Sequence, residues 1–213
     1  MEPFIFILEI IGTCAFAVSG AVASIIKRLD LFGVLFCGLI TALGGGVIRD
    51  ILLSNLPPVM FCNYIYAFFA LGTALTTFIF ARIASASFET KAETIDSINN
   101  FFDAVGLGVF TIVGINIALS MGYTDNPFFA VFLGMTTGCG GGLLRDIFIR
   151  EVPFILTKKI YAIASILGGV LYYILVAELR FDAFLSVIIG IAFILILRLL
   201  STYFRWDLPK AIK

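Results

Sequence analysis

The chain has 213 residues, of which 61% are hydrophobic and 13% charged, and its mean hydropathy is +1.12. A soluble domain is about half apolar and a quarter charged, so this composition predicts an integral membrane protein. Fourteen basic and fourteen acidic side chains cancel, which removes the field that would attract nucleic acid, and the absence of histidine excludes histidine-based metal sites and general bases.

Seven apolar segments are long enough to cross a bilayer, since a spanning helix needs about 20 mostly apolar residues. In chain order they cover residues 4–26, 31–53, 58–82, 98–120, 127–149, 159–177 and 182–203. Helices are expected because hydrocarbon offers the backbone no hydrogen-bond partners, and the segments lack the alternation of a transmembrane barrel. The sequence therefore predicts an all-α membrane protein with seven transmembrane helices in a single membrane domain, residues 1–213.

The basic residues predict the orientation of these helices. With the N-terminus outside, twelve of the fourteen basic side chains lie on the inner side, and only Arg49 and Arg180 lie on the outer side. Loops on the cytoplasmic side of a membrane carry an excess of lysine and arginine. We therefore expect a multi-pass protein of the cell inner membrane with an external N-terminus and a cytoplasmic C-terminus.

Two segments of the chain repeat each other. Residues 12–20 (GTCAFAVSG) align with 106–114 (GLGVFTIVG), and residues 44–50 (GGGVIRD) align with 140–146 (GGGLLRD). The offset stays between 94 and 96, so the two copies differ only by short insertions. This regularity indicates an internal duplication.

Each copy holds three predicted helices, the first copy over 4–82 and the second over 98–177, separated by the polar connection 85–97. An odd number of helices makes the second copy enter the membrane from the opposite side. The sequence thus predicts two inverted three-helix repeats plus a seventh helix, 182–203, outside the symmetry. Inverted repeats recur in transport proteins, with the substrate path at the repeat interface.

Three successive glycines inside a spanning helix are unusual, because each lowers helix propensity by about 1 kcal/mol relative to alanine. They permit a kink or an unwound turn whose carbonyl groups could coordinate a cation. The alternative is close helix packing, since small residues let two backbones approach. Because the triple glycine occurs twice and precedes charged residues, we expect kinked helices that line a pore.

The charges of the repeated motif need partners. Arg49 and Asp50 are neighbours in sequence, and neighbours do not face each other on a helix, so each is expected to pair elsewhere. The repeat relates Glu9 to Asp103, and each lies at the membrane depth of one motif arginine. We predict Glu9–Arg49 and Asp103–Arg145 ion pairs, one near each mouth of a path, which serve a gate or tie the helices in register.

Other polar residues are weaker signals. Four hydroxyl side chains could line a wet path, namely Thr41, Thr136, Thr137 and Ser19. Such groups in spanning helices more often bond their own backbone. Lys158 and Lys159 could attract anionic lipid headgroups, although snorkelling charges that set the topology are the simpler interpretation.

The doubled Gly-x-x-x-Phe-x-x-x-Gly segment, followed each time by Gly-Gly-Gly-x-x-Arg-Asp, resembles the prokaryotic members of the trimeric intracellular cation (TRIC) channels, which are also grouped as a glycine-transporter domain family. The resemblance covers about residues 5–203 and implies a homotrimer in membrane lipid, with one pore per protomer between the kinked second and fifth helices. The implied activity is passive permeation of monovalent cations, chiefly potassium, without a cofactor. The implied pore residues are Gly44, Gly45, Gly46, Arg49, Asp50, Gly140, Gly141, Gly142, Arg145 and Asp146.

A secondary transporter for a small zwitterion such as glycine is the main alternative, because inverted repeats and broken helices fit it equally well. A membrane enzyme is poorly supported, since the sequence offers no histidine, no metal-ligand cluster and no nucleophile–base pair.

Overall fold

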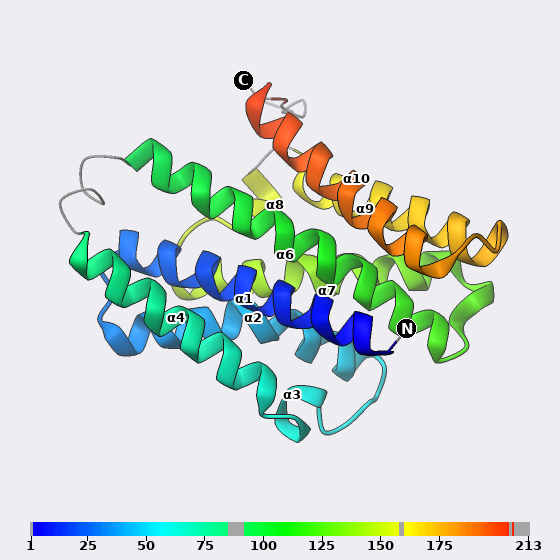
Figure 1. The fold of residues 1–213 in the computed structure, drawn as a ribbon, viewed down its shortest axis with the longest axis horizontal. Helices are drawn as coiled ribbons and strands as arrows, with labels where there is room; N and C mark the ends of the chain where they lie inside the picture. Colours follow the sequence, from blue (N-terminus) through cyan, green and yellow to red (C-terminus); the bar gives the residue numbers. More distant parts are fainter. Residues whose placement is uncertain (1, 85–91, 158–159, 205, 207–213) are drawn as a thin grey trace.

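The computed structural model describes residues 2–84, 92–157, 160–204 and 206 (Figure 1). In these ranges all regular elements are helical, and seven helices are long and apolar enough to span a membrane, which confirms the predicted fold class. The spanning helices are α1 (Glu2–Ile26), α2 (Leu31–Leu52), α4 (Ile65–Ile83), α6 (Ala92–Ser120), α7 (Pro127–Phe148), α9 (Tyr161–Tyr173) and α10 (Ala183–Tyr203). Short elements complete the fold, namely α3 (Val59–Cys62), the 3-10 turn η1 (Tyr123–Asp125), α8 (Phe154–Thr157) and the π-helical turn η2 (Ile174–Glu178), which continues α9.

The prediction of one helix over 58–82 was wrong. Residues 59–62 form α3, the chain turns at Asn63, and α4 starts at Ile65. The side chain of Asn63 accepts a hydrogen bond of 3.2 Å from the backbone N–H of Ile65, which is the local bonding that makes asparagine favour turns over helix interiors. Apolar composition therefore located the membrane segment but missed the turn inside it.

The fourth spanning helix begins earlier than predicted. Helix α6 starts at Ala92, so residues 92–97, expected in the polar connection, are helical, while 85–91 lie outside the described residues. The other boundaries agree within a few residues. Asp30 and Asn126 cap the two motif helices, since their side chains accept hydrogen bonds from the backbone N–H groups of Gly33 and Phe129 at 2.8 and 3.0 Å.

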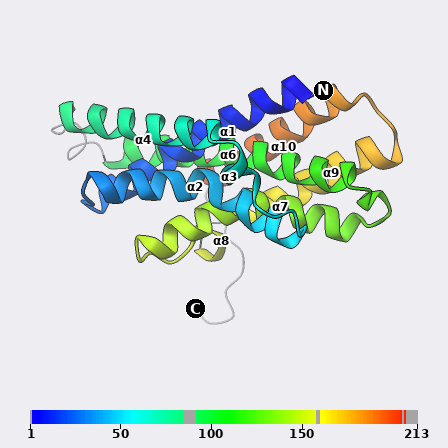
Figure 2. The same cartoon turned by 90° about the horizontal axis from the view of Figure 1, so that it is seen from below.

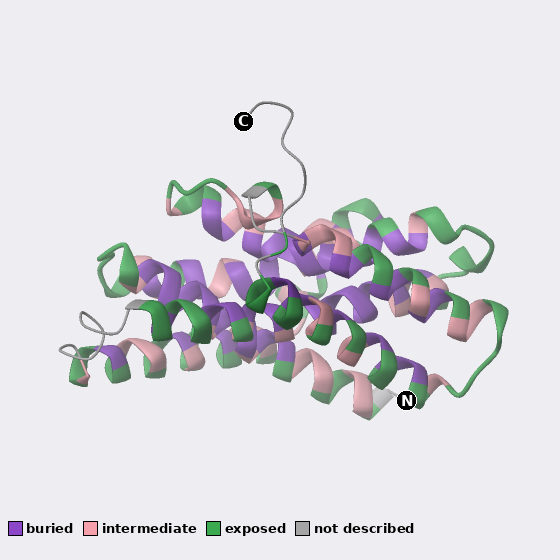
Figure 3. Ribbon diagram, turned by 90° about the horizontal axis from the view of Figure 1, so that it is seen from above, coloured by how far each residue is buried: buried purple, intermediate pink, exposed green. Residues whose placement is uncertain are grey.

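Helix α6 lies at the centre of the bundle. In the apolar 18-residue stretch of this helix 72% of the residues are buried, compared with 17% in that of α4 and 28% in that of α10. Helices α4 and α10 lie on opposite sides of α6 (Figure 1). Figure 2 shows α2 and α7 together on one side of α1 and α6, and these two helices pack extensively against each other. Buried residues concentrate on the central helices and exposed ones on the periphery (Figure 3). The apolar side chains exposed there suit contact with lipid or with further protomers.

The Gly-x-x-x-Phe-x-x-x-Gly segments form the contact between α1 and α6. The rings of Phe16 and Phe110 stack with centroids 5.5 Å apart. Each ring covers a glycine of the other copy, because a Cβ built on Gly106 would collide with Phe16 and one built on Gly12 would lie 3.0 Å from Phe110. The repeated segments therefore act as mutual knobs and holes at the centre of the molecule.

The triple glycines lie in uninterrupted helix. Both runs are α-helical throughout, so the predicted unwound turn is absent from α2 and α7. An ideal Cβ on Gly45 would stand 2.0 Å from the carbonyl oxygen of Thr137, and one on Gly141 would stand 2.0 Å from that of Thr41. Close packing of the two backbones, the alternative considered for the sequence, thus accounts for these glycines. The predicted kink stays a prediction.

Candidate functional site

Each motif arginine binds the aspartate that follows it. Arg49 places Nε and Nη2 2.8 Å from Oδ1 of Asp50, and Arg145 places Nε 2.8 Å from Oδ1 of Asp146. The expectation that sequence neighbours need other partners was wrong. The long arginine side chain bends back toward the aspartate that follows it near the end of the helix. The distance between Cβ atoms alone therefore does not decide whether two neighbouring residues can pair.

The second oxygen of each aspartate ties down the chain beyond the helix. Oδ2 of Asp50 accepts a hydrogen bond of 2.9 Å from the backbone N–H of Val59 in α3, and Oδ2 of Asp146 accepts one of 2.7 Å from that of Phe154 in α8. The carboxylate therefore joins the arginine, the end of its helix and the next short helix in both copies. Figure 1 shows α3 and α8 on opposite sides of the α1–α6 pair.

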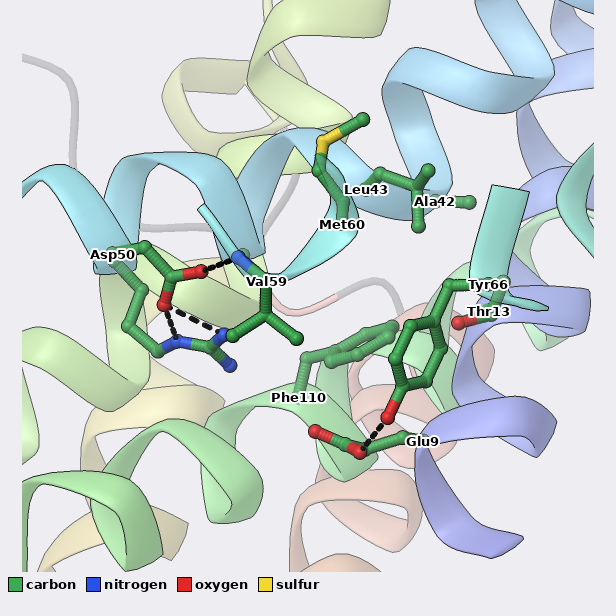
Figure 4. A pocket seen from close by; sticks show the side chains of 11 residues that line it. Glu9, Thr13, Ala42, Leu43, Asp50, Val59, Met60, Tyr66 and Phe110 are labelled. Atoms are coloured by element: carbon green, nitrogen blue, oxygen red, sulfur yellow. Dashed lines mark hydrogen bonds and ion pairs between the residues drawn. The ribbon is translucent and has the colours of Figure 1, made fainter. Parts of the chain in front are cut away.

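The first charge site comprises Glu9, Arg49, Asp50 and Tyr66. Oε2 of Glu9 accepts a hydrogen bond of 2.5 Å from the Tyr66 hydroxyl (Figure 4). The predicted Glu9–Arg49 ion pair is not formed, because among the described side chains Arg49 pairs within 4.0 Å only with Asp50. The Glu9 carboxylate binds the Tyr66 hydroxyl instead, a partner that was not predicted.

A small cavity of about 40 Å³ opens at the first charge site. Beside apolar groups, its walls include the four residues of the site, Gly46 and Thr13, whose buried hydroxyl has no hydrogen-bond partner within the described protein (Figure 4). That volume admits a water molecule or one largely dehydrated ion. One basic and two acidic groups give the site a formal charge of −1.

The second charge site comprises Asp103, Arg145, Asp146 and Tyr161. The predicted Asp103–Arg145 ion pair is formed, with Nη1 3.0 Å from Oδ1, and both side chains are fully buried. Nη1 of Arg145 also donates a hydrogen bond of 2.6 Å to the Ser19 hydroxyl of α1. Ser19, predicted as a path-lining residue, is therefore part of the polar network of this site.

Arg198 of α10, one of the twelve basic residues predicted on the inner side, also lies in the second charge site. Its side chain is 1% exposed, and Nη2 donates a hydrogen bond of 2.8 Å to Oδ1 of Asn100. The guanidinium lies over the ring of Tyr161 at 4.6 Å from the centroid. An arginine inside an apolar span was the available signal, but α10 is outside the repeat and has no counterpart for comparison.

The three predicted threonines bond their own helices. The hydroxyls of Thr41 and Thr137 donate to the carbonyl oxygens of Cys37 and Leu133 at 2.6 Å, and Thr136 donates to Leu133 at 3.0 Å. Thr41 and Thr137 are fully buried beside the α2–α7 crossing. Their side chains therefore support packing, as the alternative interpretation held.

The six motif glycines divide between the crossing and the charge sites. The first two of each run, Gly44 and Gly45 in α2 and Gly140 and Gly141 in α7, face the partner helix. The third of each run faces a charge site: Gly46 lines the first cavity, and Gly142 lies beside Asp103, Arg145 and Tyr161. The proposed lipid-binding pair, Lys158 and Lys159, lies outside the described residues.

The two charge sites lie on opposite sides of one helix crossing. Helices α2 and α7 run antiparallel, with Gly45 against Thr137, Gly141 against Thr41, and Phe36 against Phe148 at 5.2 Å between ring centroids. Arg49 is beyond the crossing in one direction and Arg145 in the other. Ionisable groups inside an apolar bundle are functional candidates by default, so fold and site together define a polytopic membrane protein with polar groups buried between its spans.

Comparisons with known proteins agree with this class. The family model described as Glycine transporter matches residues 6–82 and 100–177. The UPF0126 inner membrane protein YadS of Escherichia coli K12 is 34% identical over 202 residues, which make up 95% of this chain and 93% of the relative. The UPF0126 membrane protein YvgT of Bacillus subtilis 168 is 31% identical, over 96% of this chain and 95% of its own length.

Two solved structures share the whole fold. A prokaryotic TRIC channel crystallised in 0.5 M KCl superposes with a TM-score of 0.86 at 35% identity, over 98% of this chain and 100% of that chain. The TRIC trimeric intracellular cation channel orthologue from Rhodobacter sphaeroides gives a TM-score of 0.85 at 31% identity, over 95% of this chain and 98% of that chain. The chain belongs to the family of the prokaryotic TRIC channels, whose family model carries the description Glycine transporter.

Proposed function

We propose that this protein is a passive channel for monovalent cations, chiefly potassium, in the cell inner membrane. Each protomer of a homotrimer would hold one path, with the N-terminus outside and the C-terminus in the cytoplasm. The path would run from the first charge site, beside the α2–α7 crossing, to the second charge site. Surrounding lipid would cover the apolar periphery.

The observation that carries this proposal is the pair of charge sites on the two sides of the crossing. Each combines a carboxylate from α1 or α6, a tyrosine, and a motif arginine neutralised by its aspartate. The first site is hollow and formally negative, which suits a cation that has shed part of its water. The likeness to solved TRIC cation channels supports the same activity.

A secondary transporter for a small zwitterion such as glycine is the second candidate, and the description of the matching family model favours it. A glycine carboxylate would find an arginine in either charge site and its amine would find Glu9 or Asp103. However, both motif arginines already bind aspartates at 2.8 Å, which leaves less of each guanidinium for a carboxylate. The cation channel therefore remains the leading proposal.

Reconstitution of the purified protein in planar bilayers separates the two candidates. A channel gives unitary current steps, whereas a transporter gives saturable flux that depends on its substrate. We expect steps carried by K⁺ that fall when a bulky organic cation replaces it, and no saturable uptake of labelled glycine into proteoliposomes. Saturable glycine uptake without current steps would refute the channel and establish the transporter.

Removing one charge at the first site tests whether the path passes there. Glu9→Gln removes the formal charge that attracts cations there, so unitary K⁺ conductance should fall, more at low than at high salt because of screening. Glu93→Gln is the matched control, since Glu93 is exposed at the start of α6. Equal conductance for both variants would place the path elsewhere.

A further inference from the structure

The two charge sites differ in one feature that the repeat does not create. In the first site Tyr66 donates its hydroxyl hydrogen to Glu9, and the corresponding tyrosine of the second site, Tyr161, makes no such bond with Asp103. There the Asp103 carboxylate faces Arg145 at 3.0 Å and Arg198 at 3.8 Å. Helix α10 thus inserts a guanidinium that has no counterpart among the described side chains of the first site.

The groups around Arg198 are those that hold a partly dehydrated monovalent cation. They are the side-chain amide oxygen of Asn100 at 2.8 Å, a carboxylate oxygen of Asp103 at 3.8 Å, and the face of the Tyr161 ring. Four fully buried polar atoms in this cluster have no hydrogen-bond partner within the described protein: Oδ2 of Asp103, Nη2 of Arg145, the Tyr161 hydroxyl oxygen and Nε of Arg198. Two of them, Oδ2 of Asp103 and the Tyr161 hydroxyl oxygen, are acceptors that can coordinate a cation, whereas the two guanidinium N–H groups can only donate.

The formal charges point the same way. The first site carries one arginine and two carboxylates, and the second carries two arginines and two carboxylates. Its net charge is therefore zero instead of −1. Without Arg198 the second site would have the same formal charge as the first, which has an open cavity, and likewise one arginine, two carboxylates and one tyrosine.

We propose that the Arg198 guanidinium is a tethered counter-cation that occupies a monovalent-cation site formed by Asp103, Asn100 and the ring of Tyr161. In this conformation the guanidinium prevents permeant ions from binding at the second site. A permeant cation can bind there when the guanidinium moves out. This inference rests on the proposed cation path for its physiological meaning, but the occupancy of the site is testable without any current.

Cys139 is a native reporter for the second site. It is buried in the same core cluster as Tyr161, and at the repeat offset it corresponds to Leu43, which lines the first cavity. In a background with the other three cysteines replaced, the purified trimer is treated with small methanethiosulfonate reagents of either charge. Arg198→Gln should accelerate modification of Cys139 by the cationic reagent on the order of tenfold, the effect of one unbalanced charge at about 1.4 kcal/mol.

The charge of the reagent distinguishes site opening from unfolding. Modification by the anionic reagent should rise much less, because the emptied site is negative. Arg198→Lys keeps the counter-charge and should stay slow, and Arg82→Gln, which removes an exposed arginine at the end of α4, should leave both rates unchanged. An unchanged cationic rate in Arg198→Gln, or an equal rise for both reagents, would overturn the proposal.

Bilayer recordings then separate this inference from the proposed function. If the unsubstituted protein gives K⁺ steps, Arg198→Gln should raise open probability, with Arg82→Gln as control. If the unsubstituted protein gives no steps, the channel proposal fails while the thiol rates still decide whether Arg198 fills a cation site. Steps with an open probability unaffected by Arg198→Gln would refute the blocking role.

Discussion

The triple glycine offers a test in which neighbouring positions should respond differently. In α2 a Cβ on Gly45 would stand 2.0 Å from the Thr137 carbonyl oxygen, whereas the nearest group to a Cβ on Gly46 is the flexible end of Arg49 at 3.7 Å. If packing between α2 and α7 is the role of the motif, Gly45→Ala should be severe and Gly46→Ala mild. If the role is a flexible hinge, both should matter alike, since each loses glycine freedom equally.

The magnitude follows from the geometry. Ordinary van der Waals contact begins near 3.4 Å, so Gly45→Ala requires the two helices to separate by about 1.4 Å at their closest point. Overpacking typically costs about 1–3 kcal/mol, and the upper end applies because the opposing atom is backbone and cannot change rotamer. A loss of about 3 kcal/mol corresponds to a fall in Tm of roughly 6–12 °C for a chain of this size.

Thermal unfolding in detergent, followed by the fraction of protein that remains folded, measures these differences. Gly46→Ala should leave Tm unchanged or raise it, because alanine is favoured over glycine in helices by about 1 kcal/mol. Gly72→Ala in α4 is the matched control, since a Cβ there meets nothing within 4 Å. A fall in Tm for Gly46→Ala as large as for Gly45→Ala would refute the packing argument.

Two further predictions compare a buried and an exposed ion pair. Asp50→Ala should lower the free energy of unfolding by about 3–5 kcal/mol, because Arg49 would be left buried without its ion-pair partner and the N–H of Val59 would lose its acceptor. Denaturant unfolding measures this loss, and a value below about 1 kcal/mol would contradict the prediction. Lys27→Gln breaks the half-exposed pair with Glu151 and should change stability by less than about 1 kcal/mol, with any effect disappearing at high salt in the same assay.

Apolar composition and segment length predicted the helices because the bilayer imposes one simple requirement. A segment must be long and apolar enough to cross, so the seven spans could be located from the sequence. The boundaries failed where local polar bonding competes with that requirement, as at Asn63, whose side chain bonds the N-terminus of α4. Hydropathy averages over such single residues and cannot detect them.

The charge partners were predicted only in part, for a reason visible in the two copies. Asp103 pairs with Arg145 as expected, but its counterpart Glu9 bonds Tyr66 instead of Arg49. Repeat symmetry relates positions along the chain. The partner of a buried carboxylate depends instead on side-chain length and on which side chains the tertiary structure places next to it. The intervention of Arg198 could not follow from the symmetry, because α10 has no repeat-related partner.

The repeated motif therefore supplies structure, and the charge that distinguishes the two sites comes from outside it. Within each motif the arginine and aspartate neutralise each other, and the aspartate also fixes the following short helix. The remaining negative charge belongs to Glu9 of α1 in one site and to Asp103 of α6 in the other. Among the described side chains only the second is balanced, by Arg198, and this makes the two sites chemically different. A single residue on the seventh helix thus distinguishes the charge sites of the two copies.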